Sequence, residues 1–241
     1  MIERRAAARV TSRSKSAPAS KAGNTSASSV YDAACTRCPR LAAFLVESHQ
    51  RYPAYWSKPV PSFGDPNPSI VFVGLAPGMH GANRTGRPFT GDFAGILLYE
   101  TLYALGLANQ PNGDDPNDGL KLVRARIINS VKCLPPENKP TPDEIKRCNG
   151  YLQAELASLK KAKVLVALGR IAHEAVLAAL GHKRAAFVFA HGAEHRLDDT
   201  RWLVDSYHCS RYNTQTKRLT PEMFKSVLTR ACKLAQIDKK S

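Results

Sequence analysis

Short, nearly continuous apolar runs recur along the middle and the C-terminal half of the chain. Ser69–Leu75 and Lys163–Leu168 are rich in Val and Ile, which is typical of strands that are covered on both faces. Val123–Val131 alternates between apolar and polar residues before it turns apolar, and Ala186–Ala190 and Trp202–Ser206 are shorter runs. These five runs are the predicted strands.

Helical patterns lie between these runs. Phe93–Leu105 places apolar residues at helical spacing, and a further helix is predicted after Gly169. Thr141 and Thr220 are each followed by a proline and then by an acidic residue, which is the usual start of a helix. The alternation favours an α/β fold, with an open, mostly parallel sheet between helices. Ligands bind beyond the carboxyl ends of such strands, so the segments that follow them are the candidate functional segments.

The chain is strongly basic. Its 241 residues carry a formal net charge of +15, which favours polyanionic partners, nucleic acid before anionic membrane. No apolar run approaches the roughly 18 residues that a membrane span requires. We therefore expect a soluble protein, cytoplasmic and associated with the nucleoid of a bacterial-type cell.

Residues 1–29 form a basic segment with six Lys/Arg, one Glu and almost no large apolar side chains. Such a segment cannot bury a core, so we expect it to be disordered and the folded domain to span residues 30–241. It is typical either of an arm that binds DNA phosphates or of an Arg- and Ser-rich targeting leader. The basic character does not depend on it, because the rest of the chain keeps +10.

The first candidate segment is the long polar loop GLAPGMHGANRTGRPFTGD, which ends at Asp92. A loop of this length inside a compact domain is usually either functional or disordered. Its glycines match neither the dinucleotide nor the P-loop fingerprint. Phe89 is either a side chain that fills the core or a platform that stacks on a base. Asp92 is either the N-cap of the helix that begins near Phe93 or a carboxylate directed into the cleft.

A second candidate segment, HCSRYNTQTKRLT, begins at His208. His208 is either a structural residue or a donor to developing negative charge, with Arg211 and Lys217 nearby to hold phosphates. The neighbouring Cys209 also permits a Cys–His nucleophile, but the side chains of adjacent residues point apart.

Four of the six cysteines are spaced as metal ligands. Two residues separate Cys35 from Cys38, and Cys133 and Cys148 bracket the loop that follows a predicted strand. Without a secretory signal, this set favours a metal site over disulfides, and the spacing alone leaves zinc and an iron–sulfur cluster open. Unrelated free cysteines are the remaining alternative. Cys209 and Cys232 are left over.

Together these features resemble the uracil-DNA glycosylase superfamily, specifically its iron–sulfur family 5 (type B). GLAPGMHGANRTGRPFTGD, NSVKCLPPENKP and HCSRYNTQTKRLT look like its successive motifs, and the resemblance runs from about Cys35 to the last helix. It implies a three-layer αβα sandwich around a four-stranded, mostly parallel sheet. It also implies a [4Fe–4S] cluster on Cys35, Cys38, Cys133 and Cys148.

The same resemblance implies an activity. It is the hydrolytic removal of uracil, and of other deaminated bases such as hypoxanthine and xanthine, from DNA in base excision repair. No lysine stands at a motif position suited to a Schiff base, so strand cleavage is not expected. The partner would be DNA that contains such a base, and we expect the protein to be a monomer.

The resemblance assigns roles to five residues. Phe89 would stack on the flipped base, and Asn129 would hydrogen-bond its pyrimidine edge. His208 would stabilise the departing base, while Asp92, helped by Asn138, would orient or deprotonate water.

Further residues are expected around these five. Gly74 and Ala76 are candidates to lie against the base. The basic side chains expected to contact DNA are Arg84, Arg87, Arg211 and Lys217, and those beside the cysteines that suit phosphates are Arg37, Arg40, Lys132 and Arg147.

Two positions depart from the pattern of the superfamily. Leu75 and Ala76 follow Gly74, where most members place a carboxylate or an amide that handles the attacking water. This absence is typical of type B, in which the acid at the position of Asp92 looks like the substitute. Cys209 stands where the family often has proline.

Two other classes of protein share some of these features. One is a non-catalytic nucleic-acid-binding protein with a structural four-cysteine metal site, and the other is a redox iron–sulfur protein. A glycosylase needs Phe89, Asp92, Asn138 and His208 on one cleft, whereas a binding protein needs neither Asp92 nor His208.

Overall fold

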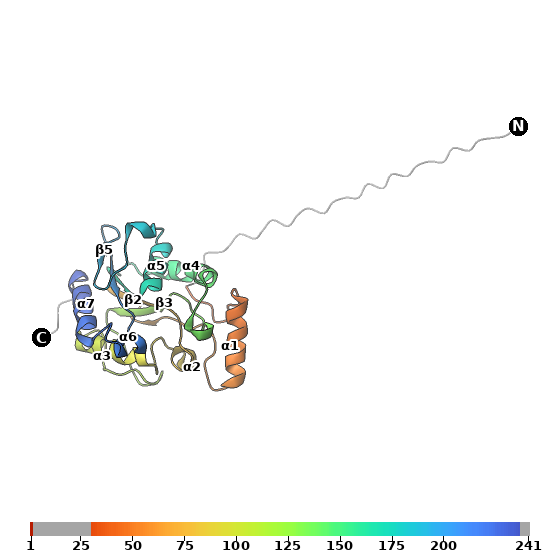
Figure 1. The fold of residues 1–241 in the computed structure, drawn as a ribbon, viewed down its shortest axis with the longest axis horizontal. Coiled ribbons are helices and arrows are strands. Elements are labelled where there is room, and N and C mark those ends of the chain that lie inside the picture. Colours follow the sequence, from red (N-terminus) through yellow and green to blue (C-terminus); the bar gives the residue numbers. More distant parts are fainter. Residues whose placement is uncertain (2–29, 237–241) are drawn as a thin grey trace.

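A six-stranded sheet forms the centre of the molecule in the computed structural model, which describes Met1 and residues 30–236 (Figure 1). The strand order is β1-β3-β2-β4-β6-β5; the four inner strands are parallel, and both edge strands are antiparallel. In chain order the strands are β1 Phe63–Gly64, β2 Ile70–Gly74, β3 Ala125–Asn129, β4 Val164–Leu168, β5 Glu194–Arg196 and β6 Trp202–Ser206.

Seven α-helices and two short 3-10 turns connect the strands within the described residues. The helices are α1 Pro39–Arg51, α2 Ala82–Thr85, α3 Phe93–Ala104, α4 Pro142–Ser158, α5 Arg170–Ala179, α6 Arg211–Gln215 and α7 Pro221–Leu234, and the turns are η1 Pro136–Asn138 and η2 Arg184–Ala186.

Helices cover both faces of the sheet, because alternate residues of each inner strand point to opposite sides. Ile70 and Phe72 of β2 pack with the apolar side chains of α3 and α7. Val71 and Val73 pack with those of α4 and α5 on the other side. The arrangement is the predicted α/β sandwich.

The helix α1 lies apart from these two layers, on the opposite side of the molecule from α7 in Figure 1. Its Leu41 and Leu45 pack with Cys133, Cys148 and Tyr151 in a third, smaller cluster. This cluster joins the N-terminal part of the described chain to the loop after β3 and to α4.

The predicted helix starts are confirmed. The Thr141 side chain accepts a hydrogen bond from the Glu144 backbone N–H, and the Glu144 carboxylate accepts one from the Thr141 N–H. Thr220 caps α7 by accepting from the Met223 N–H. Each cap satisfies backbone donors that have no partner inside the helix.

Two expectations about the strands change. The four parallel strands are present, but two short antiparallel strands extend the sheet. Ala186–Ala190 is not a strand: it ends the turn η2 and continues without regular structure. Its rings explain the apolar pattern, because Phe187 and Phe189 pack against His195 and His173 instead of pairing with a strand.

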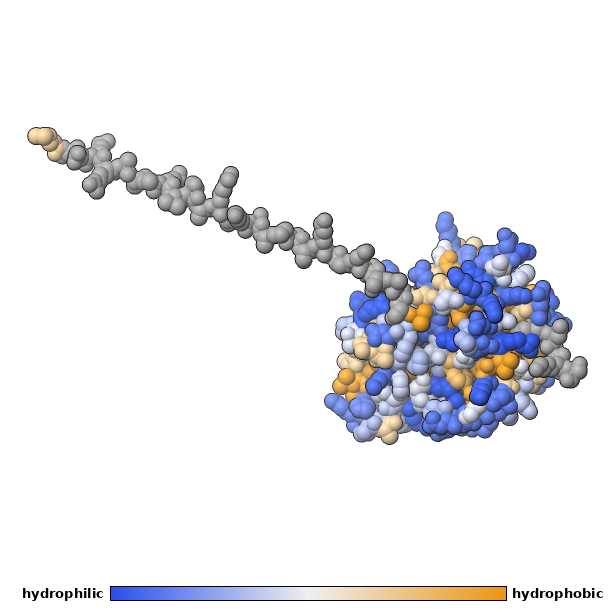
Figure 2. Space-filling model, turned by 180° about the vertical axis from the view of Figure 1, so that it is seen from behind, coloured by the Kyte–Doolittle hydropathy of each residue, from blue (hydrophilic) through white to orange (hydrophobic). Residues whose placement is uncertain are grey.

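The surface in Figure 2 is largely hydrophilic, and its apolar areas are small and separate. No helix among the described residues is long and apolar enough to cross a membrane. Apart from Met1, the basic segment 1–29 lies outside the described residues, so its predicted role stays a prediction.

Candidate active site

Three loops gather at the carboxyl ends of β2, β3 and β6. These strands run parallel, so their carboxyl ends lie at the same end of the sheet. Gly74 ends β2 directly beside Asn129, which ends β3. His208 follows β6, and its ring lies 5.9 Å from that of Phe89, centroid to centroid, with 25° between the planes. The structure thus brings together Phe89, Asn129 and His208 from three separate segments.

Gly74 allows this close approach. A Cβ at its position would lie 2.7 Å from Asn129 Oδ1 and 2.9 Å from the Phe89 ring. Phe89 itself has a backbone φ of 56°, which an aromatic residue rarely adopts. Its ring packs in the core cluster, as one of the two predictions had it, and also faces His208. Its stacking on a base stays a prediction.

The two oxygens of Asp92 have different surroundings. Oδ1 accepts a hydrogen bond from the Gly95 N–H at 2.8 Å, so Asp92 is the N-cap of α3. Oδ2 lies over the glycine loop, 2.6 Å from where a Gly81 Cβ would be and 4.0 Å from that of Gly78. The carboxylate makes no ion pair with a described residue, and burial raises its pKa above the usual range.

Both ring nitrogens of His208 lack a hydrogen-bond partner within the described part of the chain, while its carbonyl accepts a bond of 2.8 Å from Asn213 Nδ2. Burial lowers the pKa of His208 to about 4. The imidazole is therefore neutral near pH 7, with one N–H to donate.

The two asparagines differ in position. Asn129 is buried, and its amide has no hydrogen-bond partner among the described residues. Asn138 is exposed in η1, and it and Glu137 both have positive φ, 56° and 53°. No hydrogen bond joins Asn138 to Asp92 or His208 in the described structure, and its predicted help to Asp92 stays a prediction.

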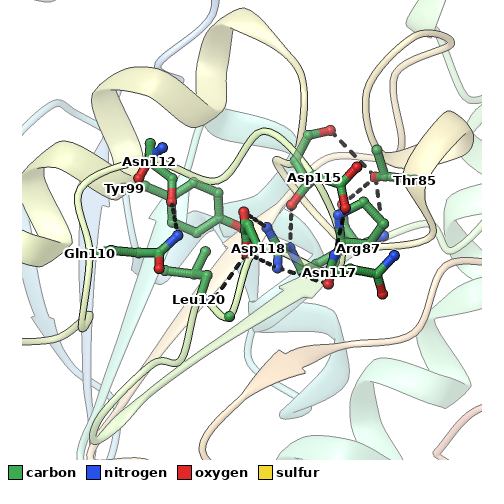
Figure 3. A network of polar contacts seen from close by, with 12 residues as sticks. Thr85, Arg87, Tyr99, Gln110, Asn112, Asp115, Asn117, Asp118 and Leu120 are labelled. Atoms are coloured by element: carbon green, nitrogen blue, oxygen red, sulfur yellow. Dashed lines mark hydrogen bonds and ion pairs between the residues drawn. The ribbon is translucent and has the colours of Figure 1, made fainter.

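Of the four predicted DNA-contacting side chains, Arg87 does not fit. Its guanidinium is buried and pairs with both carboxylate oxygens of Asp118, at 2.9 and 2.7 Å (Figure 3). Its Nε donates to Thr90. Arg87 therefore holds the glycine loop to the segment around Asp118, and no local pattern predicts this contact between residues 31 positions apart. Arg211 and Lys217 are exposed, and Arg84 is half-buried, with its Nε donating to the His80 carbonyl.

Most of the basic side chains beside the cysteines also form ion pairs within the protein. Lys132 is buried and pairs with Glu155 at 3.2 Å, and Arg40 pairs with Glu144 at 2.7 Å. The expected phosphate contact is wrong for Lys132, which the protein encloses.

A model of the uracil DNA glycosylase superfamily matches residues 61–231, which include all three loops. The chain belongs to this superfamily. It is 50% identical over 207 residues to a type-5 uracil-DNA glycosylase of Thermus thermophilus, covering 84% of this chain and 94% of that protein. Type-5 uracil-DNA glycosylases of Pyrobaculum aerophilum (43% identical; 82% and 87% covered) and Mycobacterium tuberculosis (40%; 85% and 79%) are also similar. These relatives place the chain in type 5.

In this type-5 family member, the four predicted cysteine ligands line one cavity. Cys38 is the residue before α1, Cys133 follows β3, and Cys148 lies on α4 and accepts a hydrogen bond from the Lys132 N–H at 3.3 Å. All six cysteines are free thiols. The other two, Cys209 and Cys232, are buried in the main core cluster, away from this cavity.

The spacing of the four sulfur atoms suits a group larger than one ion. Two sulfurs bound to the same zinc, each about 2.3 Å from it, lie at most about 4.6 Å apart. Among the described residues, no three of these sulfurs lie within 4.8 Å of one another. A cluster that offers each thiolate its own iron accepts the wider spacing. The donor set therefore fits an iron–sulfur cluster better than a single zinc ion.

The sequence interpretation missed a second group of residues, which lies beside His208. Arg170, Phe189, Tyr207 and Arg218 line a cavity together with His208. The signal for Arg170 was its place directly after the buried strand β4 and Gly169. Phe189 and Arg218 carried no comparable signal.

Proposed function

We propose that this protein is a DNA repair enzyme that hydrolyses the N-glycosidic bond of uracil in DNA. The observation that carries the proposal is the convergence of Phe89, Asn129 and His208 around Gly74, with Oδ2 of Asp92 over the adjoining loop. The type-5 uracil-DNA glycosylases that it resembles point to the same chemistry.

The target nucleotide leaves the base stack, because its reacting carbon cannot be reached inside a duplex. Phe89 supplies a ring on which the flipped base stacks. The unpaired amide of Asn129 hydrogen-bonds the edge of the base, and the absence of a side chain at Gly74 leaves room for it.

Bond cleavage leaves negative charge on the base and positive charge on the sugar. His208 donates its N–H to the developing oxyanion of the base, and a neutral imidazole suits this role because it holds its proton firmly. Asp92 accepts a proton from the attacking water and stabilises the cationic sugar through Oδ2, while Oδ1 keeps the cap of α3.

We further propose that hypoxanthine and xanthine are substrates. Among the described residues, Asn129 is the buried side-chain amide that lies beside Gly74, and it can present either its oxygen or its NH₂ to a base after a half turn. A single adaptable amide discriminates little between uracil and deaminated purines. Leu75 and Ala76 add no polar group that would do so.

The test uses otherwise identical duplexes with uracil, hypoxanthine, xanthine or an unmodified base at one position. After incubation and alkali, cleavage at the three modified positions and none in the unmodified duplex is expected. Without alkali the strand should remain intact, since no lysine stands at a motif position suited to a Schiff base. Binding to every duplex without base release would favour the alternative, a nucleic-acid-binding protein with a structural metal site.

We propose that Cys35, Cys38, Cys133 and Cys148 hold a [4Fe–4S] cluster with a structural role. The cavity between them joins α1, the loop after β3 and α4. Ala76 and Met79 of the glycine loop pack on the same apolar cluster as these cysteines. The bound cluster would therefore fix the loop that carries Phe89 and Asp92.

Gly74→Ala is expected to lower the rate of uracil release by about 10²-fold, the scale of a displacement near 1 Å at a reacting centre. The added methyl group would displace Asn129 and Phe89. Single-turnover kinetics measures the effect. Gly150→Ala is the matched control, because Gly150 lies inside α4 with nothing within 4 Å of the added Cβ. A Gly74→Ala variant as active as Gly150→Ala would remove the pocket from the account.

The single-turnover rate is expected to be constant around neutral pH and to fall on the acid side. Asp92 must be ionised to accept a proton, and burial raises its pKa, so activity is lost as the pH falls through that raised value. His208 stays neutral down to about pH 4, so its titration does not change the rate near neutral pH. In Asp92→Asn the residual rate should not show this acid limb. An unchanged limb in that variant would assign it to another group.

A further inference from the structure

The cavity beside His208 has a basic and aromatic lining that the base-binding residues do not explain. Gly169 and Arg170 enter it at the start of α5, Phe189 and Ala190 from the loop before β5, and Tyr207 and Arg218 from the segments after β6. A Cβ on Gly169 would lie 3.5 Å from that of His208, so the start of α5 adjoins the catalytic histidine.

Two guanidinium groups stand on aromatic faces in this cavity. Arg170 lies over the Phe189 ring, 5.3 Å from its centroid, and Arg218 lies over the Tyr207 ring at 4.6 Å. Both arginines are exposed, and neither forms an ion pair or a hydrogen bond within the described residues. Their N–H donors are therefore free, while the rings restrict their positions.

A buried network fixes the loop that carries Phe189. His173 Nδ1 lies 2.8 Å from Asp205 Oδ1, and its Nε2 lies 3.0 Å from the Phe187 carbonyl oxygen. His195 Nε2 lies 3.1 Å from the other oxygen of Asp205. The His173 ring therefore links Asp205 of β6 to the backbone of the loop that carries Phe189.

The other aromatic platform is tied to the same loop. The Tyr207 N–H donates to His191 Nδ1 at 3.1 Å, and the two rings stack with centroids 4.9 Å apart. Tyr207 directly precedes His208. The rings of Phe189 and Tyr207 are thus both held by the loop before β5, beside the catalytic histidine.

We propose that Arg170 and Arg218 form a clamp for DNA phosphates that flank the flipped nucleotide. Free guanidinium groups bind phosphate oxygens in pairs. The two arginines stand on neighbouring rings of the His208 cavity, since the centroids of Phe189 and Tyr207 lie 6.3 Å apart, and this spacing suits successive phosphates of a strand that is bent out of the duplex there. The inference rests on the proposed glycosylase function, and it identifies how the same site holds its DNA.

The test measures the affinity of Arg170→Gln, Arg218→Gln and the double variant for a duplex with one stable abasic-site analogue, at several salt concentrations. Each single variant is expected to bind roughly tenfold more weakly, as when a charge-assisted hydrogen bond is lost. The slope of log affinity against log salt should fall by about one for each arginine and about two for the double variant. The single-turnover rate at saturating protein should change little.

Arg51→Gln is the matched control. Arg51 is exposed at the end of α1 and lies over the Tyr52 ring at 5.4 Å, so the variant removes the same charge and the same kind of ring contact away from the cavity. It should keep the wild-type slope with the abasic-site duplex.

Two results would overturn the clamp. One is a double variant with the slope of Arg51→Gln. The other is an equal loss of affinity for the undamaged duplex, which would make the arginines general DNA contacts. A wild-type protein that released no uracil while the variants still showed the expected slopes would contradict the proposed function and not the phosphate contacts.

Discussion

Asp92→Asn and His208→Ala are each expected to slow uracil release by roughly 10²–10⁴-fold under single-turnover conditions, the usual scale of a positioned acid–base or oxyanion group. Both residues act on charge that develops only in the transition state. Affinity for uracil-containing DNA should therefore change little in either variant. A tenfold or greater loss of affinity with a normal rate at saturation would move these residues from chemistry to binding.

The structure sharpens the choice of variants at His208. The ring is neutral, has no hydrogen-bond partner among the described residues and faces Phe89. Alanine removes the donor without leaving a partner unpaired, so the folded protein should lose little stability from hydrogen bonding. His208→Gln restores an N–H donor in part and is expected to be faster than His208→Ala. Equal rates in the two variants would argue against hydrogen-bond donation as the role of His208.

Replacement of any of the four cavity cysteines by serine is expected to abolish the iron–sulfur colour. It should also lower the free energy of unfolding more than any other variant proposed for this protein. Burial and neighbouring thiols raise the pKa of Cys148 and Cys38, so these two thiols need a bound cation to be ionised near neutral pH. Without the cluster, α1 and the loop after β3 lose their common anchor. The protein purified without oxygen should be brown and contain about four iron atoms per chain.

Cys209→Ala and Cys232→Ala are the controls for this prediction. Both cysteines are buried in the main core cluster and line none of the cavity, so their replacement should keep colour and iron content. A colourless protein with about one zinc per chain would overturn the assignment of iron and keep the four ligands. Loss of colour in either control would mean that the wrong four cysteines were chosen.

Local signals in the sequence predicted most of the sheet and the caps. The central strands β2 and β4 are nearly continuous apolar runs, and Thr141 and Thr220 act on backbone groups within three residues of themselves. The edge strands β1 and β5 have two and three residues, which is too short for a periodic pattern to develop.

At the site, the sequence does not predict contacts between residues that lie far apart along the chain. The loop sequence around Arg87 predicts a free phosphate ligand, because its ion-pair partner Asp118 lies 31 positions further along the chain. Asp92 was given two alternative roles, yet its two oxygens have separate environments, one at the cap and one over the glycine loop. Whether a side chain has a partner depends on the fold. Arg170 and Arg218 are proposed to bind phosphates because the fold leaves their guanidinium groups without a partner among the described residues.

Asp92 is proposed to act in the chemistry as well as to cap α3, and a comparison of two variants with the wild type separates these roles. The single-turnover rate of uracil release and the melting temperature are measured for the wild type, Asp92→Asn and Asp92→Ala. Asparagine keeps an oxygen for the Gly95 N–H, so only alanine should lose the cap, at a cost of about 1 kcal/mol. The account predicts that both variants lose 10²–10⁴-fold in rate while only Asp92→Ala melts clearly earlier. A near-wild-type rate in Asp92→Asn, or in a less stable but folded Asp92→Ala, would contradict the account and leave Asp92 as a cap alone.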